Sequence, residues 1–82
     1  MQANEVIRAM VKDSGIAQTT VSLSMGRRQN YVASYISRKR IPSIELMAEM
    51  ADSAGFDLVL RNRHSGNEIQ IDPPDNLPSQ RD

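Results

Sequence analysis

The spacing of the apolar residues changes at Gly55, and this change constrains the fold more than any other feature of the chain. Before Gly55 apolar residues recur at intervals of three and four, as Ile7, Met10 and Val11 do, which is the spacing of a helix. After Gly55 they alternate at every second position, which is typical of a strand. We therefore expect a mostly α protein, with four helices followed by a C-terminal β-hairpin.

Glycine, proline and small polar residues divide the helical part into segments. We expect helices over Ala3–Ser14, Gln18–Met25 and Arg28–Ser37, and a fourth that Pro42-Ser43 opens and Gly55 ends. Gly26 breaks the second helix, and because glycine accepts positive φ we expect it to take the left-handed conformation of a turn. Ser43 is expected to cap the fourth helix with its hydroxyl. Residues 1–55 would then form one helical domain.

Residues 56–72 are predicted to form the hairpin. A two-residue Ser65-Gly66 turn would pair Leu60 with Ile71, and Arg63 with Glu68. The apolar residues of both strands would then share one face. An isolated hairpin is only marginally stable, so we expect this element to join two copies as a homodimer. The proline-rich residues 73–82 are predicted to be a disordered tail.

The charges of the chain are separated along its length, although ten Lys and Arg balance ten Asp and Glu. Residues 1–40 hold seven basic and two acidic residues, and residues 41–82 hold three basic and eight acidic ones. The stretch 27–40 contains five basic residues and no acid. Such a molecule can present one face to phosphates while the opposite face stays acidic.

Several classes of function find no support in the composition. The chain has no cysteine and one histidine, His64, so we expect no metal site and no cofactor. No nucleophile and base are spaced as a catalytic set, and we expect no enzyme. No apolar run approaches the roughly 20 residues that a membrane helix needs, and the N-terminus lacks the pattern of a signal peptide. We expect a soluble cytoplasmic protein with no membrane partner.

The stretch from Gln18 to Arg38 predicts a helix-turn-helix. Two short helices that cross steeply need a small contact residue, which Ser22 provides, and a turn residue that accepts positive φ, which is Gly26. The chain here resembles the lambda-repressor-like family, which includes Cro, repressor and XRE-type regulators. The likeness spans roughly Glu5 to Leu60 and is carried by Gln18, Ser22, Gly26, Val32, Tyr35, Pro42-Ser43-Ile44 and the phrase from Ala51 to Phe56. Arg27, Ile36 and Arg38 depart from the family's usual residues, and the hairpin is similar to the C-terminal strand with which some Cro-like members dimerise.

The resemblance implies which residues contact double-stranded DNA. The residues expected to contact bases are Arg28, Gln29, Asn30 and Ser34, at the exposed start of the second helix of the motif, which enters the major groove. The residues expected to contact phosphates are Gln18, Arg27, Arg38, Lys39 and Arg40. For Arg27 a stem that only covers the core is an equal alternative.

This pattern favours a sequence-specific transcriptional regulator that binds a short palindromic operator as a homodimer. It favours repression over activation. The alternative is the antitoxin of a toxin–antitoxin pair, which would bind DNA to regulate itself and would have a cognate toxin as a second partner. A third interpretation is an interaction module that has lost DNA binding, against which the acid-free basic stretch argues.

Overall fold

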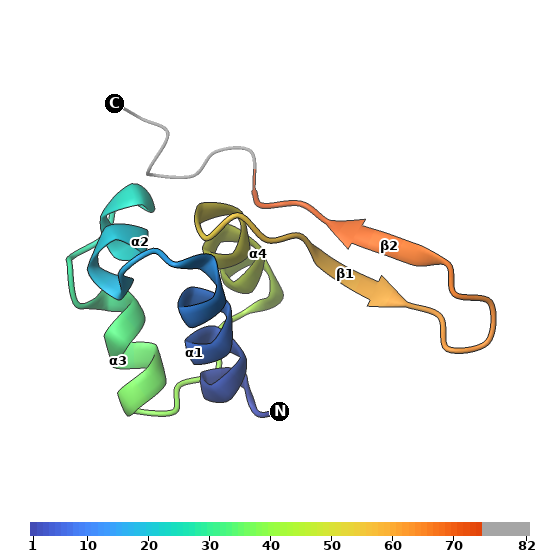
Figure 1. The fold of residues 1–82 in the computed structure, drawn as a ribbon, viewed down its shortest axis with the longest axis horizontal. Helices are drawn as coiled ribbons and strands as arrows, with labels where there is room; N and C mark the ends of the chain where they lie inside the picture. The colour runs from blue at the N-terminus through green and yellow to red at the C-terminus, as the bar shows by residue number, and fades with distance from the viewer. Residues whose placement is uncertain (75–82) are drawn as a thin grey trace.

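The computed structural model describes residues 1–74, in which four helices precede a two-stranded antiparallel hairpin (Figure 1). The elements are α1 (Ala3–Ser14), α2 (Gln18–Ser24), α3 (Tyr31–Ser37), α4 (Ile44–Ser53), β1 (Leu58–Arg61) and β2 (Glu68–Ile71). The mostly helical class with a hairpin after the fourth helix is therefore confirmed. Residues 75–82, which hold most of the tail predicted to be disordered, lie outside the described residues.

Two helix starts follow the local signals of the sequence. The N–H of Leu46 donates to the Ser43 hydroxyl at 3.1 Å, so Ser43 caps α4 as predicted. At α1 the N–H of Gln2 donates to the Glu5 carboxylate at 2.8 Å, which secures the first turn. Both helix starts depend on residues within one turn of each other, and such contacts can be read from the sequence.

The third helix begins three residues later than predicted. The sequence predicted a helix from Arg28, but α3 starts at Tyr31, and residues 28–30 form a turn in which the Tyr31 N–H donates to the Arg28 carbonyl at 3.0 Å. Asn30 takes the N-cap position with φ −100° and ψ 14°. The start of α3 is set by Ser22, whose hydroxyl oxygen accepts the N–H of Val32 at 3.0 Å from ten positions earlier in the chain. That contact is tertiary, and helical spacing does not reveal it.

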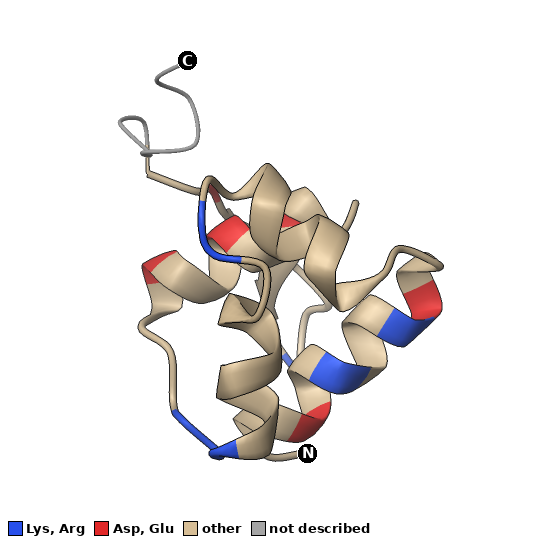
Figure 2. Ribbon diagram, turned by 90° about the vertical axis from the view of Figure 1, so that its left-hand side faces the viewer, with Lys and Arg blue, Asp and Glu red and all other residues tan. Residues whose placement is uncertain are grey.

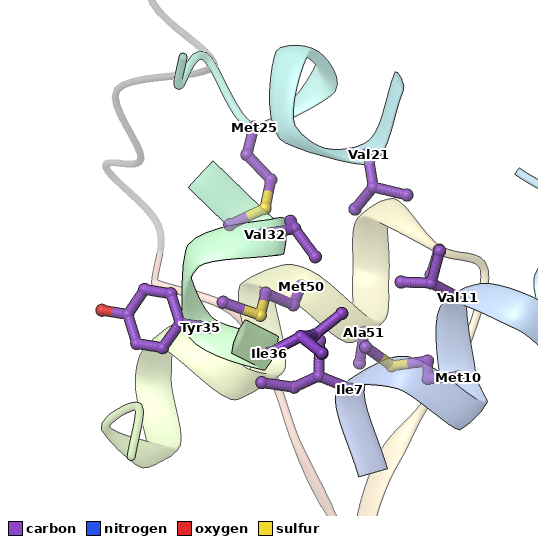
Figure 3. Packing of buried hydrophobic residues seen from close by; sticks show 11 residues of the cluster. Ile7, Met10, Val11, Val21, Met25, Val32, Tyr35, Ile36, Met50 and Ala51 are labelled. Atoms are coloured by element: carbon purple, nitrogen blue, oxygen red, sulfur yellow. The ribbon is translucent and has the colours of Figure 1, made fainter. Parts of the chain in front are cut away.

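The core lies between the four helices. Figure 3 shows side chains from α1, α3 and α4 meeting at its centre, with Val21 of α2 and Met25 above them. Ile7, Val21, Val32 and Met50 have no exposed surface. Burying a side chain of this size contributes about 1.5–3 kcal/mol. This packing holds α2 and α3, which have only seven residues each and would not be stable as isolated helices.

The hairpin is present, but its register differs by two residues from the predicted one. Leu60 pairs with Ile69 rather than Ile71, and Arg61, not Arg63, pairs with Glu68. The cause is Asn62, whose side-chain oxygen accepts the N–H groups of His64 and Ser65 at 2.8 and 3.2 Å and so closes a longer turn. Because the shift is an even number of residues, the apolar side chains of both strands still share one face.

The hairpin extends from the helices on the side opposite α3 (Figure 1). Near its far end, Leu60 and Ile69 expose 58% and 68% of their surface. Its apolar face is thus covered by the helices only near Leu58 and Ile71, which are half-buried. Among residues 1–74, no helix has both the length and the apolar character that crossing a membrane requires.

Candidate nucleic-acid interface

The segment from α2 to α3 is held together by a buried serine and a left-handed glycine. Ser22 is fully buried; its hydroxyl donates to the Gln18 carbonyl at 3.0 Å and accepts from the N–H of Val32. Gly26 has φ 72°, which confirms the conformation predicted for it. The N–H of Arg27 then returns to the Ser22 carbonyl at 3.1 Å. One small residue therefore fixes the turn to both helices.

The structure brings together three of the four residues predicted to contact bases, but in the turn before α3 and not on the helix. Arg28, Gln29 and Asn30 are consecutive and exposed. Asn30 occupies the N-cap position without a side-chain capping bond, so its amide is not used by the helix. Ser34 lies on α3, half-buried, and its hydroxyl donates to the Tyr31 carbonyl at 2.7 Å.

The outward face of α3 contains two further residues that sequence reasoning missed. Ala33 is half-buried and Ser37 is exposed, and with Ser34 they are the residues of α3 that neither the core nor the tyrosines occupy. Their spacing of three and four positions was a signal that could have found them. All three side chains are small and uncharged, so another molecule can approach the backbone of α3 closely.

The loop after α3 carries the predicted phosphate-binding residues Arg38, Lys39 and Arg40, all exposed. The N–H groups of Lys39 and Arg40 donate to the carbonyls of Ile36 and Tyr35 at 3.4 and 3.2 Å, a Schellman ending of the helix. This ending gives Lys39 a φ of 54°, and Lys39 is the one residue other than glycine with positive φ in residues 1–74. The chain therefore accepts backbone strain at a position where it also displays a cation.

Gln18, the remaining residue expected at phosphates apart from Arg27, is the first residue of α2 and is half-buried. Its carbonyl accepts the Ser22 hydroxyl, which ties the start of α2 to the same serine that fixes the turn. Gln18 is thus positioned by the α2–α3 packing and not by a loop.

Arg27 lies in a different environment from the other basic residues. Its Nη2 is 3.2 Å from Oε1 of Glu49, and its side chain is 27% exposed while that of Glu49 is 4% exposed. Sequence reasoning missed Glu49, because a glutamate in an amphipathic helix is usually solvated. A signal was present in the alternative left open for Arg27, a stem that covers the core in place of a phosphate contact.

Two tyrosines line one side of α3 between these basic segments. The rings of Tyr31 and Tyr35 are 5.4 Å apart and inclined at 60°, and the guanidinium groups of Arg27 and Arg40 lie 5.2 and 4.3 Å from the ring centres of Tyr31 and Tyr35. Burial, and then the neighbouring Tyr35 hydroxyl, raise the pKa of Tyr31 above its usual value of 10. Tyr31 is therefore a neutral phenol at physiological pH.

Charge is distributed on this face in two separate segments. Figure 2 shows Lys and Arg at the two ends of α3, in the turn before it and in the loop after it, with no charged residue on the helix itself. In residues 1–74, no group of three or more Asp, Glu and His residues is arranged to hold a metal ion. The arrangement is suited to a polyanion: the basic residues can contact its negative charges, and the uncharged face of α3 can contact neutral groups between them.

Comparison with family models, with curated proteins and with solved structures gave no match for this chain.

Proposed function

We propose that this protein is a sequence-specific DNA-binding regulator that represses rather than activates transcription. In this proposal α2, the turn and α3 act as a lambda-repressor-like helix-turn-helix. The observation that carries the proposal is the neutral, small-residue face of α3 with a basic segment at each end (Figure 2). A helix of seven residues is about 10 Å long, close to the roughly 12 Å width of the major groove. A helix of this length therefore fits in the groove with the residues of the turn at one end near base edges and the basic loop at the other end near the phosphate backbone.

Base reading is assigned to the turn and the first part of α3. Gln29 and Asn30 are exposed amides that can each pair with N6 and N7 of adenine, and Arg28 can pair with O6 and N7 of guanine. Ala33 offers a methyl group to thymine, and Ser34 offers a hydroxyl to a hydrogen-bond donor or acceptor on a base edge.

Phosphate binding is assigned to Arg38, Lys39 and Arg40 after α3, and to Gln18 at the start of α2. The three cations are exposed and lie in one loop. Each phosphate that a Lys or Arg neutralises releases condensed counterions, which makes binding fall steeply with salt. These residues supply affinity without sequence information, whereas the turn supplies the sequence preference.

The hairpin is assigned to dimerisation. Leu60 and Ile69 form an exposed cross-strand pair on the apolar face of the hairpin. Leu58, on the same face, also lines a mostly apolar groove of about 730 Å³ between α1, α4 and β1, so the groove adjoins the apolar face of the hairpin at this residue. A twofold dimer through this surface would leave both α3 helices free, because α3 lies on the opposite side of each copy (Figure 1).

Selection of duplexes from a random pool by the purified protein tests the proposal. We expect enrichment of a palindrome whose half-sites are separated by about one helical turn, or a multiple of it. Binding to the selected duplex should exceed binding to a scrambled one by about a thousand-fold or more at physiological salt. If no duplex is retained even at low salt, the regulator function is wrong. Co-purification of a second small chain would favour the antitoxin alternative.

A further inference from the structure

A carboxylate is buried behind the turn that precedes α3. Glu49 lies on α4 among core residues, with its side chain 4% exposed. An ionised carboxylate in such surroundings is strongly destabilising unless it is paired. Its partner is Arg27, which reaches it across 22 positions of sequence with Nη2 3.2 Å from Oε1. The chain therefore pairs a buried carboxylate with an arginine whose side chain is 27% exposed.

Stability alone is a poor reason for this pair. Buried ion pairs are often replaced by apolar residues with no loss of stability. In the Arg27–Glu49 pair, one polar atom of each side chain forms no hydrogen bond: Arg27 Nε and Glu49 Oε2 are buried with no hydrogen-bond partner among residues 1–74. A single Nη2–Oε1 contact joins the two side chains, and the fork geometry that makes such pairs strong is not completed. A different role for the pair is therefore needed.

The pair connects the turn to a helix that the turn does not otherwise bond. Within residues 1–74 the Arg27 N–H and the Val32 N–H both bond to Ser22 of α2. The Arg27–Glu49 bond is the one hydrogen bond from this turn to α4. The same guanidinium lies 5.2 Å from the ring centre of Tyr31, the first residue of α3. One side chain thus fixes both the turn and the start of α3 against α4.

We propose that Arg27 and Glu49 are positioning residues that set the orientation of Arg28, Gln29 and Asn30 toward the bases, and that Arg27 does not itself bind a phosphate. The proposal rests on the DNA-binding function proposed above and decides between the two roles that the sequence left open for Arg27. The three reading residues lie in a turn and not in a helix, so their orientation depends on what holds the turn.

Arg40 provides the contrast at the other end of α3. Its guanidinium lies 4.3 Å from the ring centre of Tyr35, but the residue is exposed and makes no ion pair within residues 1–74. Its polar edge is therefore free for a phosphate, whereas Arg27 is directed inward to a carboxylate. The two arginines make a matched pair of variants for the test.

The test measures binding of the full chain to the selected duplex and to a scrambled duplex over a range of salt. Glu49→Gln and Arg27→Lys should each lower the ratio of the two affinities by about ten-fold, the effect of removing one side chain's hydrogen bonds to a base. Neither should change the slope of log affinity against log salt. Arg40→Gln should weaken binding to both duplexes equally and reduce the slope by about one unit.

The opposite pattern overturns the proposal. If Arg27 binds a phosphate, Arg27→Lys changes the affinities for both duplexes in parallel and leaves their ratio intact, and Glu49→Gln releases the guanidinium and does not lower the ratio. A variant with Arg27→Met and Glu49→Leu together separates positioning from stability. It should remain folded by circular dichroism and still have a lowered ratio; a folded double variant with the wild-type ratio would also overturn the proposal.

A measurement without DNA separates this proposal from the function on which it rests. In the NMR spectrum of the free protein, we expect a distinct Arg27 side-chain N–H signal that disappears in Glu49→Gln. If that signal is present and depends on Glu49 but no duplex binds, the DNA-binding function has failed while the internal pair stands. If the wild-type signal is averaged with those of exposed arginines, the pair is not held and the positioning role is wrong.

Discussion

Residues 1–55 and the hairpin of residues 56–72 differ in how they use their apolar side chains. In the helical part, Ile7, Val21 and Val32 are fully buried by neighbours from other helices. In the hairpin, Leu60 and Ile69 leave 58% and 68% of their surface exposed. Four helices enclose a volume, whereas two strands make a single layer that cannot cover both of its faces. The helical part therefore buries its apolar side chains by itself, whereas the hairpin leaves part of its apolar face uncovered.

The largest expected effect comes from a charge on the apolar face of the hairpin. Leu60→Asp should weaken the dimer by roughly 3 kcal/mol, about a hundred-fold, because a twofold interface receives the carboxylate twice. Val59 is on the opposite face of β1 and 37% exposed, so Val59→Asp is the matched control and should leave the dimer intact. Sedimentation equilibrium measures both. If Leu60→Asp leaves the dimer unaffected, the apolar face of the hairpin is not the dimer interface.

The next effect falls inside the helical part, at the turn between α2 and α3. Gly26 has φ 72°, and Gly26→Val should destabilise the fold by about 1–3 kcal/mol because a β-branched residue resists that conformation. Gly26→Asn, which tolerates left-handed φ, should cost clearly less. Urea denaturation of both variants gives the difference. Equal stability of the valine variant and the wild type would show that the turn is not needed.

Ser22 gives a smaller loss at the same crossing. Ser22→Ala should lower the free energy of unfolding by about 1–2 kcal/mol, because the buried N–H of Val32 loses its acceptor. Ser24 makes a similar local bond to the Val21 carbonyl but is exposed, so Ser24→Ala should change stability by at most about 0.5 kcal/mol. A thermal melt of each variant compares them. Similar losses in the two would remove the special role given to Ser22.

The smallest effect has the opposite sign, and it separates the stability of the helical part from its DNA binding. Lys39 has φ 54° at the end of α3, and Lys39→Gly should raise the free energy of unfolding by about 0.5 kcal/mol because glycine relieves the strain. The same change should reduce the salt slope of DNA binding by about one unit. Denaturation and a salt titration test the two parts separately. If Lys39→Gly is less stable than the wild type, the backbone at Lys39 is not strained.

The helices could be predicted from the sequence because their signals are local. Ser43 caps α4 through a residue three positions away, and Gly26 takes a positive φ, which glycine accepts because it has no Cβ. The start of α3 could not be predicted, because it depends on a hydroxyl ten positions earlier, at Ser22. The predicted hairpin register was wrong for a similar reason. The Asn62 side chain closes a longer turn, which forms in place of the predicted two-residue Ser65-Gly66 turn.

The candidate site was predicted less completely than the fold. Basic residues in an acid-free run could be found from composition, and they lie at the two ends of α3 (Figure 2). Whether a particular arginine faces outward could not be found in this way. The sequence left the role of Arg27 open but not that of Arg40, and in the structure Arg27 lies against Glu49 while Arg40 is exposed. The position of Glu49, 22 residues from Arg27 in sequence, is what directs Arg27 inward, and the sequence did not reveal it.

In the proposed function, the turn before α3 contacts bases and the loop after it contacts phosphates. A salt titration of Gln29→Ala and Lys39→Ala against the selected and scrambled duplexes tests this division. Gln29→Ala should cost about 1–3 kcal/mol on the selected duplex and far less on the scrambled one. Lys39→Ala should weaken both duplexes similarly and reduce the salt slope by about one unit. If the two variants behave alike on both duplexes, this division between reading and holding is wrong.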